Sequence, residues 1–229
     1  MHIEPSAVSG VELIGPDAPE FRMCIESLVR GAPPAALQTA LPYSVVVKNS
    51  GERPLVLLGI RFDMLSRQKK PYSVVHYADT LRYPDKPGLA PGAFRFVCAE
   101  PRYTAMVLRG ESHADSRGAM NLVNLATALR VAASLDCVAF TDGEFAGPDS
   151  HGAFDRFRRE RDAESALIGE VLEAGSEVEA VLVKAIEQSD GPPRRALAKV
   201  LLTAFQSGGA DELAASARSH RIKLQLWRA

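Results

Sequence analysis

The densest group of potential metal ligands in the sequence lies between positions 142 and 155. Carboxylates and one imidazole beside a turn can hold a divalent cation through oxygen ligands and a single nitrogen. The candidate ligands are Asp142, Asp149 and His151, with Glu144 and Asp155 close by. Their spacing does not match an EF-hand loop. Asp142 suits a turn and Asp149 a helix cap without any metal, so we assign no metal site.

Groups suited to acid–base catalysis are few in this sequence. His113 with Asp115, or His76, are candidate general bases, but no serine or cysteine has the sequence context of a nucleophile. Ser66 and Lys69 match the Ser-x-x-Lys pattern of acyl-transfer enzymes, yet Ser66 follows a predicted strand instead of opening a helix. GxGxxG, Walker A, HExxH and GxSxG motifs are absent. We therefore predict no catalytic residues, no cofactor-binding residues and no cofactor.

The composition is that of a globular protein with almost no net charge. The 229 residues are 46% hydrophobic, and 27 basic residues against 28 acidic ones give a formal charge of -1. This balance argues against nucleic-acid and membrane partners. No apolar run approaches the length of a membrane span, and the N-terminus lacks the pattern of a signal peptide. If Met1 is the native start we expect a cytoplasmic protein; an exported form with its signal removed is the alternative.

The three cysteines, Cys24, Cys98 and Cys137, are far apart in the sequence and form no CxxC or Cys/His pattern. This spacing argues against a zinc site. A disulfide between Cys24 and Cys98 is one interpretation. Buried free thiols are the interpretation we favour, since free cysteine behaves as a small apolar residue.

The candidate ligands are positioned by the stretch from Leu129 to Asp149. Apolar residues on both faces around Cys137 predict a central strand. Asp142-Gly143 predicts a tight hairpin turn, and Gly147-Pro148 ends the return strand. Asp149 and Ser150 are candidate N-caps for a helix that begins near His151.

Before this stretch the pattern predicts mainly strands. Residues 43–49 and 55–64 alternate in polarity and predict an antiparallel hairpin, followed by strands at 72–77 and 93–98. Residues 1–16 are expected to lie on the surface as an arm. Residues 17–30 favour a helix opened by an Asp17/Glu20 capping box, although a strand fits the same alternation. Residues 99–118 are predicted to be a long polar excursion with a short strand at 104–108.

After position 149 the apolar period becomes helical. The pattern predicts one helix to about Glu173, a second that opens near Ser176, and a third from Pro192 or Pro193 to Gly208-Gly209. A last segment begins near Asp211. Its end, residues 222–226, fits either a terminal strand or a helix.

Many short strands with turns between them point to a β-sandwich. The sequences PYSVVVKNSGERPLVLLGIRFD and GLAPGAFRFV resemble the Asn-turn-Pro hairpin and the Pro-Gly-led strand of bacterial immunoglobulin-like sandwich domains. SLDCVAFTDGEFAGPDSHGAFDRF resembles a segment of uncharacterised bacterial proteins. The resemblance covers residues 42–157 and implies a fold without catalytic residues.

We therefore expect a chain that is mainly β and then α. Residues 1–149 would form an immunoglobulin-like antiparallel β-sandwich with an N-terminal arm, and residues 150–229 a helical region packed on or beside it. The function expected is a non-catalytic binding or protein-interaction module, with a protein partner or a second copy of the chain. One alternative is a metal-binding protein or metal-assisted hydrolase that uses Asp142, Asp149 and His151. The other is a structural component of an assembly.

Overall fold

The structure, a computed structural model, describes residues 1–30, 34–80, 88–111, 116–188 and 191–225. The chain divides into two compact units. Unit 1 comprises Met1–Thr80, Pro87–Thr141 and Phe145–Pro148, and unit 2 comprises Leu81–Lys86, Asp142–Glu144 and Asp149–Ala229. Each unit forms around a hydrophobic core of its own.

Unit 1 contains two β-sheets in its described residues. The five-stranded sheet has the order β1-β7-β4-β5, with β8 paired to β7. Its strands are β1 (His2–Ile3), β4 (Leu55–Leu65), β5 (Pro71–Asp79), β7 (Arg130–Phe140) and β8 (Phe145–Ala146). The three-stranded sheet has the order β2-β3-β6, with β2 at Val11–Ile14, β3 at Ser44–Asn49 and β6 at Phe94–Cys98. β1 runs parallel to β7, and the other pairs are antiparallel.

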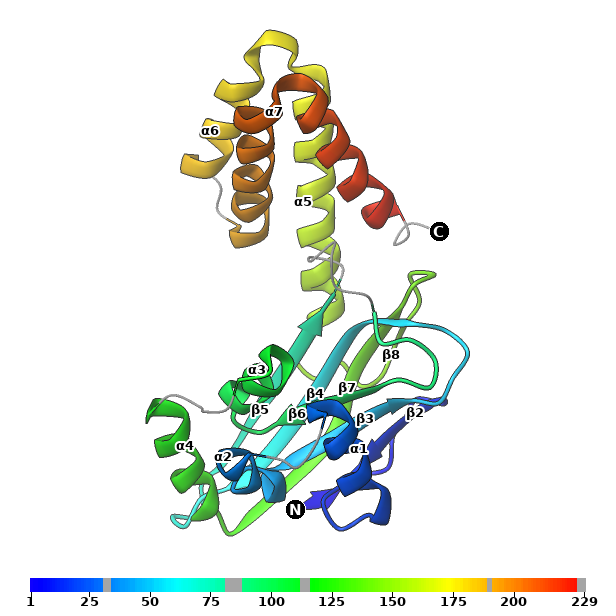
Figure 1. The fold of residues 1–229 in the computed structure, drawn as a ribbon, viewed down its shortest axis with the longest axis vertical. Helices are drawn as coiled ribbons and strands as arrows, with labels where there is room; N and C mark the ends of the chain where they lie inside the picture. The colour runs from blue at the N-terminus through cyan, green and yellow to red at the C-terminus, as the bar shows by residue number, and fades with distance from the viewer. Residues whose placement is uncertain (31–33, 81–87, 112–115, 189–190, 226–229) are drawn as a thin grey trace. The chain divides into compact units, whose positions relative to one another are not determined.

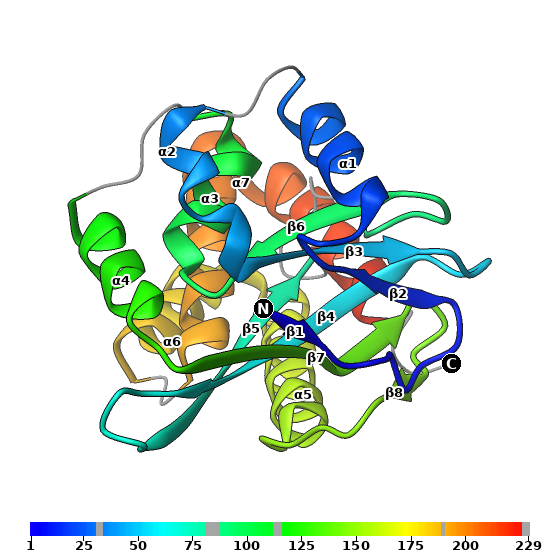
Figure 2. The same cartoon turned by 90° about the horizontal axis from the view of Figure 1, so that it is seen from below.

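Helices lie beside these sheets in unit 1. They are α1 (Pro19–Val29), α2 (Ala35–Gln38), a 3-10 turn (Leu41–Tyr43), α3 (Pro101–Arg109) and α4 (Ser116–Ala126). Figure 2 shows α2, α3 and α4 along one side of the unit. The core cluster joins both sheets to α1, α3 and α4, with members such as Ile25, Val46, Phe62, Phe96, Met106 and Leu125.

β4 lies in the middle of the larger sheet. The residues that alternate along its core face are all buried, as the period of two predicts: Leu58, Ile60, Phe62 and Met64. His76 on β5 pairs with Ile60, so it faces the same core. The pairing of β4 with β7 shifts between Gly59 and Ile60, where Asp136 is the additional residue of a β-bulge.

The predicted immunoglobulin-like antiparallel β-sandwich is wrong. The structure is 50% helical and 25% strand, and its two small sheets mix parallel and antiparallel pairs without forming a closed sandwich. Strands do precede helices along the chain, as expected. The excess of helix in unit 1 arises largely from α3 and α4. The apolar period did not predict α3, and from Met120 to Leu129 it fitted a helical turn and a bulged strand equally well.

Residues 99–118 illustrate this error. The strand predicted at 104–108 lies within α3. Glu100 caps the helix by accepting from the backbone N–H of Arg102, Pro101 occupies its first turn, and Gly110 ends it at φ 67°. These end signals outweigh the short alternation of apolar residues between them.

The hairpin predicted from residues 43–49 and 55–64 is also wrong. β3 pairs with β2 and β6, whereas β4 pairs with β5 and β7, so the two strands belong to different sheets. Buried Asn49 fixes the connection, because its Nδ2 donates to the carbonyl oxygens of Arg53 and Leu89, each at 2.8 Å. The Asn-turn-Pro sequence therefore carries the chain from one sheet to the other.

The N-terminal segment differs in detail from the prediction. The helix favoured for residues 17–30 is confirmed as α1, but its N-cap is Ala18 and no side chain caps it, so the Asp17/Glu20 capping box does not form. Residues 11–14 of the predicted surface arm form β2, which pairs with β3. The short alternation Val11, Leu13 was the signal for this strand.

From Ala153 onward the described residues of unit 2 are mainly helical and form α5 (Ala153–Glu173), a 3-10 turn (Gly175–Glu177), α6 (Val178–Gln188) and α7 (Pro192–Gln225). Its core consists of side chains from all three α-helices, such as Leu167, Ile168, Leu182 and Leu201. The predicted helices are confirmed. The terminal strand is wrong as far as Gln225, where the chain is helical, and Leu226 lies outside the described residues. Figure 1 shows α7 turning back on itself within this unit.

Candidate functional site

Asp142 occupies a turn, as predicted. β7 and β8 form an antiparallel pair in which Ala139 lies opposite Phe145. The Oδ1 atom of Asp142 accepts from the backbone N–H of Glu144 at 3.1 Å, and Gly143 has φ 87°. The turn is longer than the predicted two-residue type, since residues 140–144 separate the paired residues Ala139 and Phe145.

Asp149 caps α5. Its Oδ1 accepts from the N–H of Ala153 at 2.5 Å and its Oδ2 from the N–H of Phe154 at 3.1 Å. Both carboxylate oxygens therefore bind free donors of the first helical turn. The N-cap residue itself is Gly152, so the prediction of Asp149 as the N-cap is wrong by three positions. Asp149 still supplies the capping hydrogen bonds, with its backbone in the left-handed region at φ 50°.

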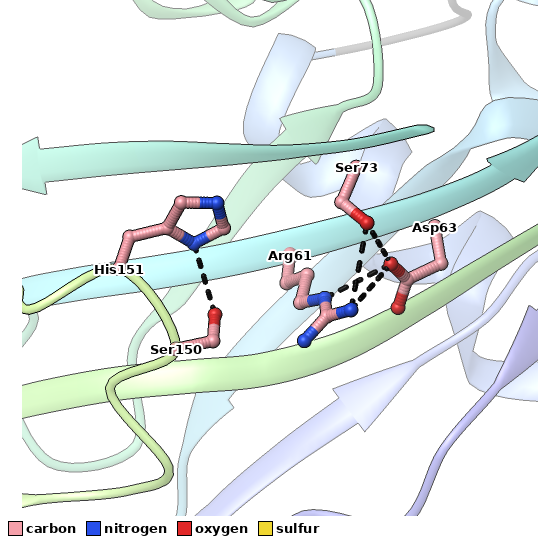
Figure 3. A network of polar contacts seen from close by, with 5 residues as sticks. All are labelled: Arg61, Asp63, Ser73, Ser150 and His151. Carbon is pink, nitrogen blue, oxygen red and sulfur yellow. Dashed lines mark hydrogen bonds and ion pairs between the residues drawn. The ribbon is translucent and has the colours of Figure 1, made fainter. Parts of the chain in front are cut away.

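His151 forms a hydrogen bond with its neighbour, between Nδ1 and the Ser150 hydroxyl at 2.9 Å (Figure 3). In the part of the chain that the structure describes, Asp142, Asp149 and His151 do not bring one ligand atom each within 4.8 Å of one another. The structure thus places the three candidates near one turn without gathering them around a common point. His113 and Asp115 lie outside the described residues.

A buried polar centre lies where β6 passes into α3. Glu100 is buried, and its Oε1 accepts from the Arg102 guanidinium at 3.0 Å and from the Arg102 backbone N–H at 3.3 Å. Its Oε2 accepts from Nδ2 of Asn121, on α4, at 2.8 Å. The carboxylate is thereby compensated by one cation and two neutral donors, which is what a buried charge requires.

Cys98 lies at the end of β6, next to this centre. Its Sγ accepts from the N–H of Glu100 at 3.4 Å, and its own N–H donates to the Thr104 hydroxyl at 2.8 Å. Burial raises the pKa of the Cys98 thiol to about 11. At neutral pH the sulfur is protonated and lacks the thiolate character of a nucleophile. All three cysteines are buried free thiols, as predicted.

His76 faces the same part of the core from β5. Its ring centroid lies 5.3 Å from that of Phe62, and both ring nitrogens are buried without a hydrogen bond of normal geometry among the described residues. Burial lowers the pKa of His76, and the charge of Glu100 offsets this only in part. A catalytic Cys–His pair needs a thiolate and an imidazolium. Here both groups are held in their neutral forms.

A polar network crosses the β4–β5 pair on the face opposite the core. Arg61 donates to the Oδ1 atom of Asp63 from Nε at 2.9 Å, and the Ser73 hydroxyl donates to the same oxygen (Figure 3). Burial raises the pKa of Asp63, but hydrogen bonds from Ser73 and Arg61 and the Arg61 charge outweigh this and lower it. Because Arg61 and Asp63 are two residues apart on one strand, the sequence could indicate that their side chains share a face. The position of Ser73 opposite Asp63 follows from the pairing of β4 with β5, which the sequence does not specify.

Beside α3 the surface is concave. A pocket of about 370 Å³ lies between the ends of α1 and α3, with apolar walls that include Leu28, Leu37 and Met106. Arg30 and Glu111 also line it. The volume is that of a small-ligand site, but charges of both signs favour no particular class of ligand.

Exposed large apolar side chains occur in several elements of the described chain, and three of them lie in or just after α4. Leu122 and Leu125 of this helix are buried in the core, whereas Met120 and Val123 are 66% and 63% exposed on its other face. Leu129, which precedes β7, is 57% exposed. We call the exposed face of α4 that carries Met120 and Val123 the α4 surface.

The turn between β4 and β5 lies against the end of α4. Leu129 donates its backbone N–H to the carbonyl oxygen of Leu65 at 2.8 Å, and Nε of Arg67 donates to the carbonyl oxygen of Thr127 at 3.2 Å. Basic residues of this turn, Lys69 and Lys70, are exposed. Residues 64–78 and 116–135 contain no Asp or Glu. Asp63 adjoins the first segment and lies close enough to Arg130 for the Arg130 charge to lower its pKa.

No family model matches the chain, and neither curated proteins nor solved structures gave a match. The resemblance to uncharacterised bacterial proteins therefore stays a prediction. In the described part of the chain, no helix is both long enough and apolar enough to span a membrane.

Proposed function

We propose that the protein is a non-catalytic protein-interaction module, and that the α4 surface binds an acidic amphipathic segment of a partner protein. The observation that carries this proposal is the exposure of Met120 and Val123 on one face of a helix whose other face is core. Apolar groups gathered on an otherwise polar surface are typical of interaction sites.

The helical spacing supports a binding face. Met120 and Val123 are three residues apart, which puts their side chains next to each other on α4. Their burial against an apolar partner would remove two large side chains from water, which stabilises a complex by about 1.5–3 kcal/mol for each side chain fully covered.

The basic residues next to this face indicate which kind of partner binds there. The segments that contain the α4 surface and the adjoining turn carry Arg67, Lys69, Lys70, Arg117 and Arg130 and no acidic residue. Such a basic border attracts acidic side chains and accelerates association with them. Because α4 offers no aromatic side chain on which bases stack, and the chain as a whole has a formal charge of -1, a protein fits this surface better than a nucleic acid.

The test uses the full chain as bait, with one double variant and one matched control. Met120→Asp/Val123→Asp places charges on the α4 surface. Met23→Asp introduces one such charge at a residue that is 64% exposed on α1. Proteins captured by chemical cross-linking from cell extract are identified, purified and titrated against each bait. We expect a protein bound by the wild type and the control but weakened at least tenfold by the double variant.

The outcome that contradicts the proposal is equally defined. A purified protein that binds all three baits with the same affinity would place its site elsewhere. Binding of duplex DNA or of anionic vesicles by the α4 surface, in place of a protein, would replace the proposed partner with another class of molecule.

A further inference from the structure

The last helix of unit 2 is interrupted at a single residue. α7 spans Pro192–Gln225, and within it Gly209 has non-helical angles of φ 65° and ψ -151°. This region of backbone conformation is accessible essentially to glycine alone. We call residues 192–208 α7a and residues 210–225 α7b. In Figure 1 the orange half of α7 runs upward and the red half runs back down.

The neighbouring glycine also depends on the bend. A Cβ atom added at Gly208 would lie 2.5 Å from the Cβ of Glu212. In a straight helix, Cβ atoms four residues apart are separated by about 5–6 Å. A side chain at either glycine therefore opposes the bent form and is compatible with the straight one.

In the bent form of α7, in which the helix turns back at Gly209, a small apolar contact holds α7b against the rest of unit 2. Leu213 and Ala217, four residues apart, are its buried side chains among residues 210–220, and both belong to the core of unit 2. Around them the core is formed by α5, α6 and α7a, with members such as Ile168, Leu182 and Leu201. These helices form the apolar site that accommodates Leu213 and Ala217 of α7b, and we call this site the seat of α7b.

We propose that α7b is an exchangeable element through which two copies of the chain associate. When Gly209 adopts helical angles, α7 becomes one straight helix. At 1.5 Å per residue, the 16 residues of α7b then extend about 24 Å beyond the hinge and leave their own seat. The α7b of a second copy fills that seat with the same contacts, and the exchange is reciprocal, as in other domain-swapped dimers. The partner is thus a second copy, because its segment is the one for which the seat is shaped.

The experiment compares Gly209→Ala with wild type and with Gly169→Ala. Gly169 lies within α5, has no positive φ, and has open space around a Cβ, so the same chemical change there should leave the association state unaltered. Molar mass is measured by light scattering after size-exclusion chromatography at equal concentrations of the full chain. For Gly209→Ala we expect the dimer fraction to rise at least tenfold over wild type, with unchanged helical circular dichroism.

A second substitution tests whether the dimer forms by exchange of α7b. Leu213→Asp added to Gly209→Ala removes the apolar contact of α7b and should return the chain to a monomer. Met120→Asp/Val123→Asp should leave the dimer intact, which separates this inference from the proposed function of the α4 surface. A dimer that survives Leu213→Asp, or a dimer formed equally by Gly169→Ala, would overturn the exchange.

Two further measurements test the proposal even if Gly209→Ala folds poorly. Gly208→Ala is expected to dimerise as well, because its added Cβ meets Glu212 only in the bent form. Wild-type chain refolded from urea at high concentration should also yield a dimer, which Leu213→Asp prevents. Folded monomers for both glycine variants, or no dimer from refolded wild type, would contradict the proposal.

Discussion

Glu100 accepts a hydrogen bond from the amide of Asn121 at 2.8 Å, and this contact ties the beginning of α3 to the middle of α4. The carboxylate also caps α3 and pairs with Arg102. One buried side chain thus positions α3, which the strand-based interpretation of residues 99–118 missed, together with α4, the helix that bears the α4 surface.

Replacement of Glu100 should therefore destabilise unit 1 strongly. Glu100→Ala removes an N-cap and leaves the Asn121 amide without its acceptor, and we expect a loss of about 3 kcal/mol in the free energy of unfolding. Urea titration followed by circular dichroism measures this loss. Glu111→Gln, which breaks the exposed pair with Arg109, is the control and should change stability by less than about 1 kcal/mol. Equal effects of the two variants would show that the polar centre is not structural.

His76 should make the stability depend on pH. Because burial lowers its pKa below the usual 6.5 in the folded state, the unfolded chain binds a proton first as the pH falls. Stability is then fully present above about pH 6.5 and declines as the pH is lowered through that value, until the folded state is protonated too. His76→Phe should remove this part of the slope, measured by urea titrations between pH 5 and 8. The same slope in His76→Phe and in wild type would assign the dependence to other groups, and the exposed His2→Gln is the control.

Gly59 should be intolerant of a side chain. A Cβ there would lie 2.7 Å from Sγ of Cys137 and 3.0 Å from the Tyr77 ring, so Gly59→Ala is expected to cost about 1–3 kcal/mol through overpacking. Cys137→Ala removes the closer atom. In a double-mutant cycle, the combined variant should therefore recover part of the loss caused by Gly59→Ala. Strict additivity of the two changes would mean that the contact with sulfur is not the cause.

Asp149 should stabilise the protein through its hydrogen bonds to the first turn of α5. We expect Asp149→Ala to lower the free energy of unfolding by about 0.5–2 kcal/mol. Asp149→Asn should lower it by less, because asparagine keeps one side-chain oxygen that can accept from the first turn of α5. Thermal melting with and without EDTA should give the same Tm for wild type. A divalent cation that raises the Tm of wild type, and does not raise that of Asp149→Asn or His151→Ala, would support the metal alternative instead.

Local signals in the sequence predicted local structure well. The alternation through Ile60 and Phe62 gave a strand with the correct buried face, and the carboxylate of Asp149 before an apolar helical period gave a helix cap. These features depend on residues a few positions apart.

Features that depend on distant residues were not predictable in this way. Asn49 binds the carbonyl of Leu89, forty positions later, at the connection where the chain passes from the sheet of β3 to the sheet of β4. In the same way, Glu100 depends on Asn121. The exposure of Met120 and Val123 could not be derived from their apolar character, because such residues at helical spacing are usually core.

The central claim is that the α4 surface binds a protein partner with acidic side chains. Calorimetric titration of the purified partner into wild type, Met120→Asp/Val123→Asp and Lys69→Glu/Lys70→Glu tests it most directly. We predict that the first double variant raises Kd at least tenfold, that the charge reversal also weakens binding, and that added salt weakens binding to wild type more than to the charge-reversed chain. Equal Kd values for all three chains, independent of salt, would contradict the claim.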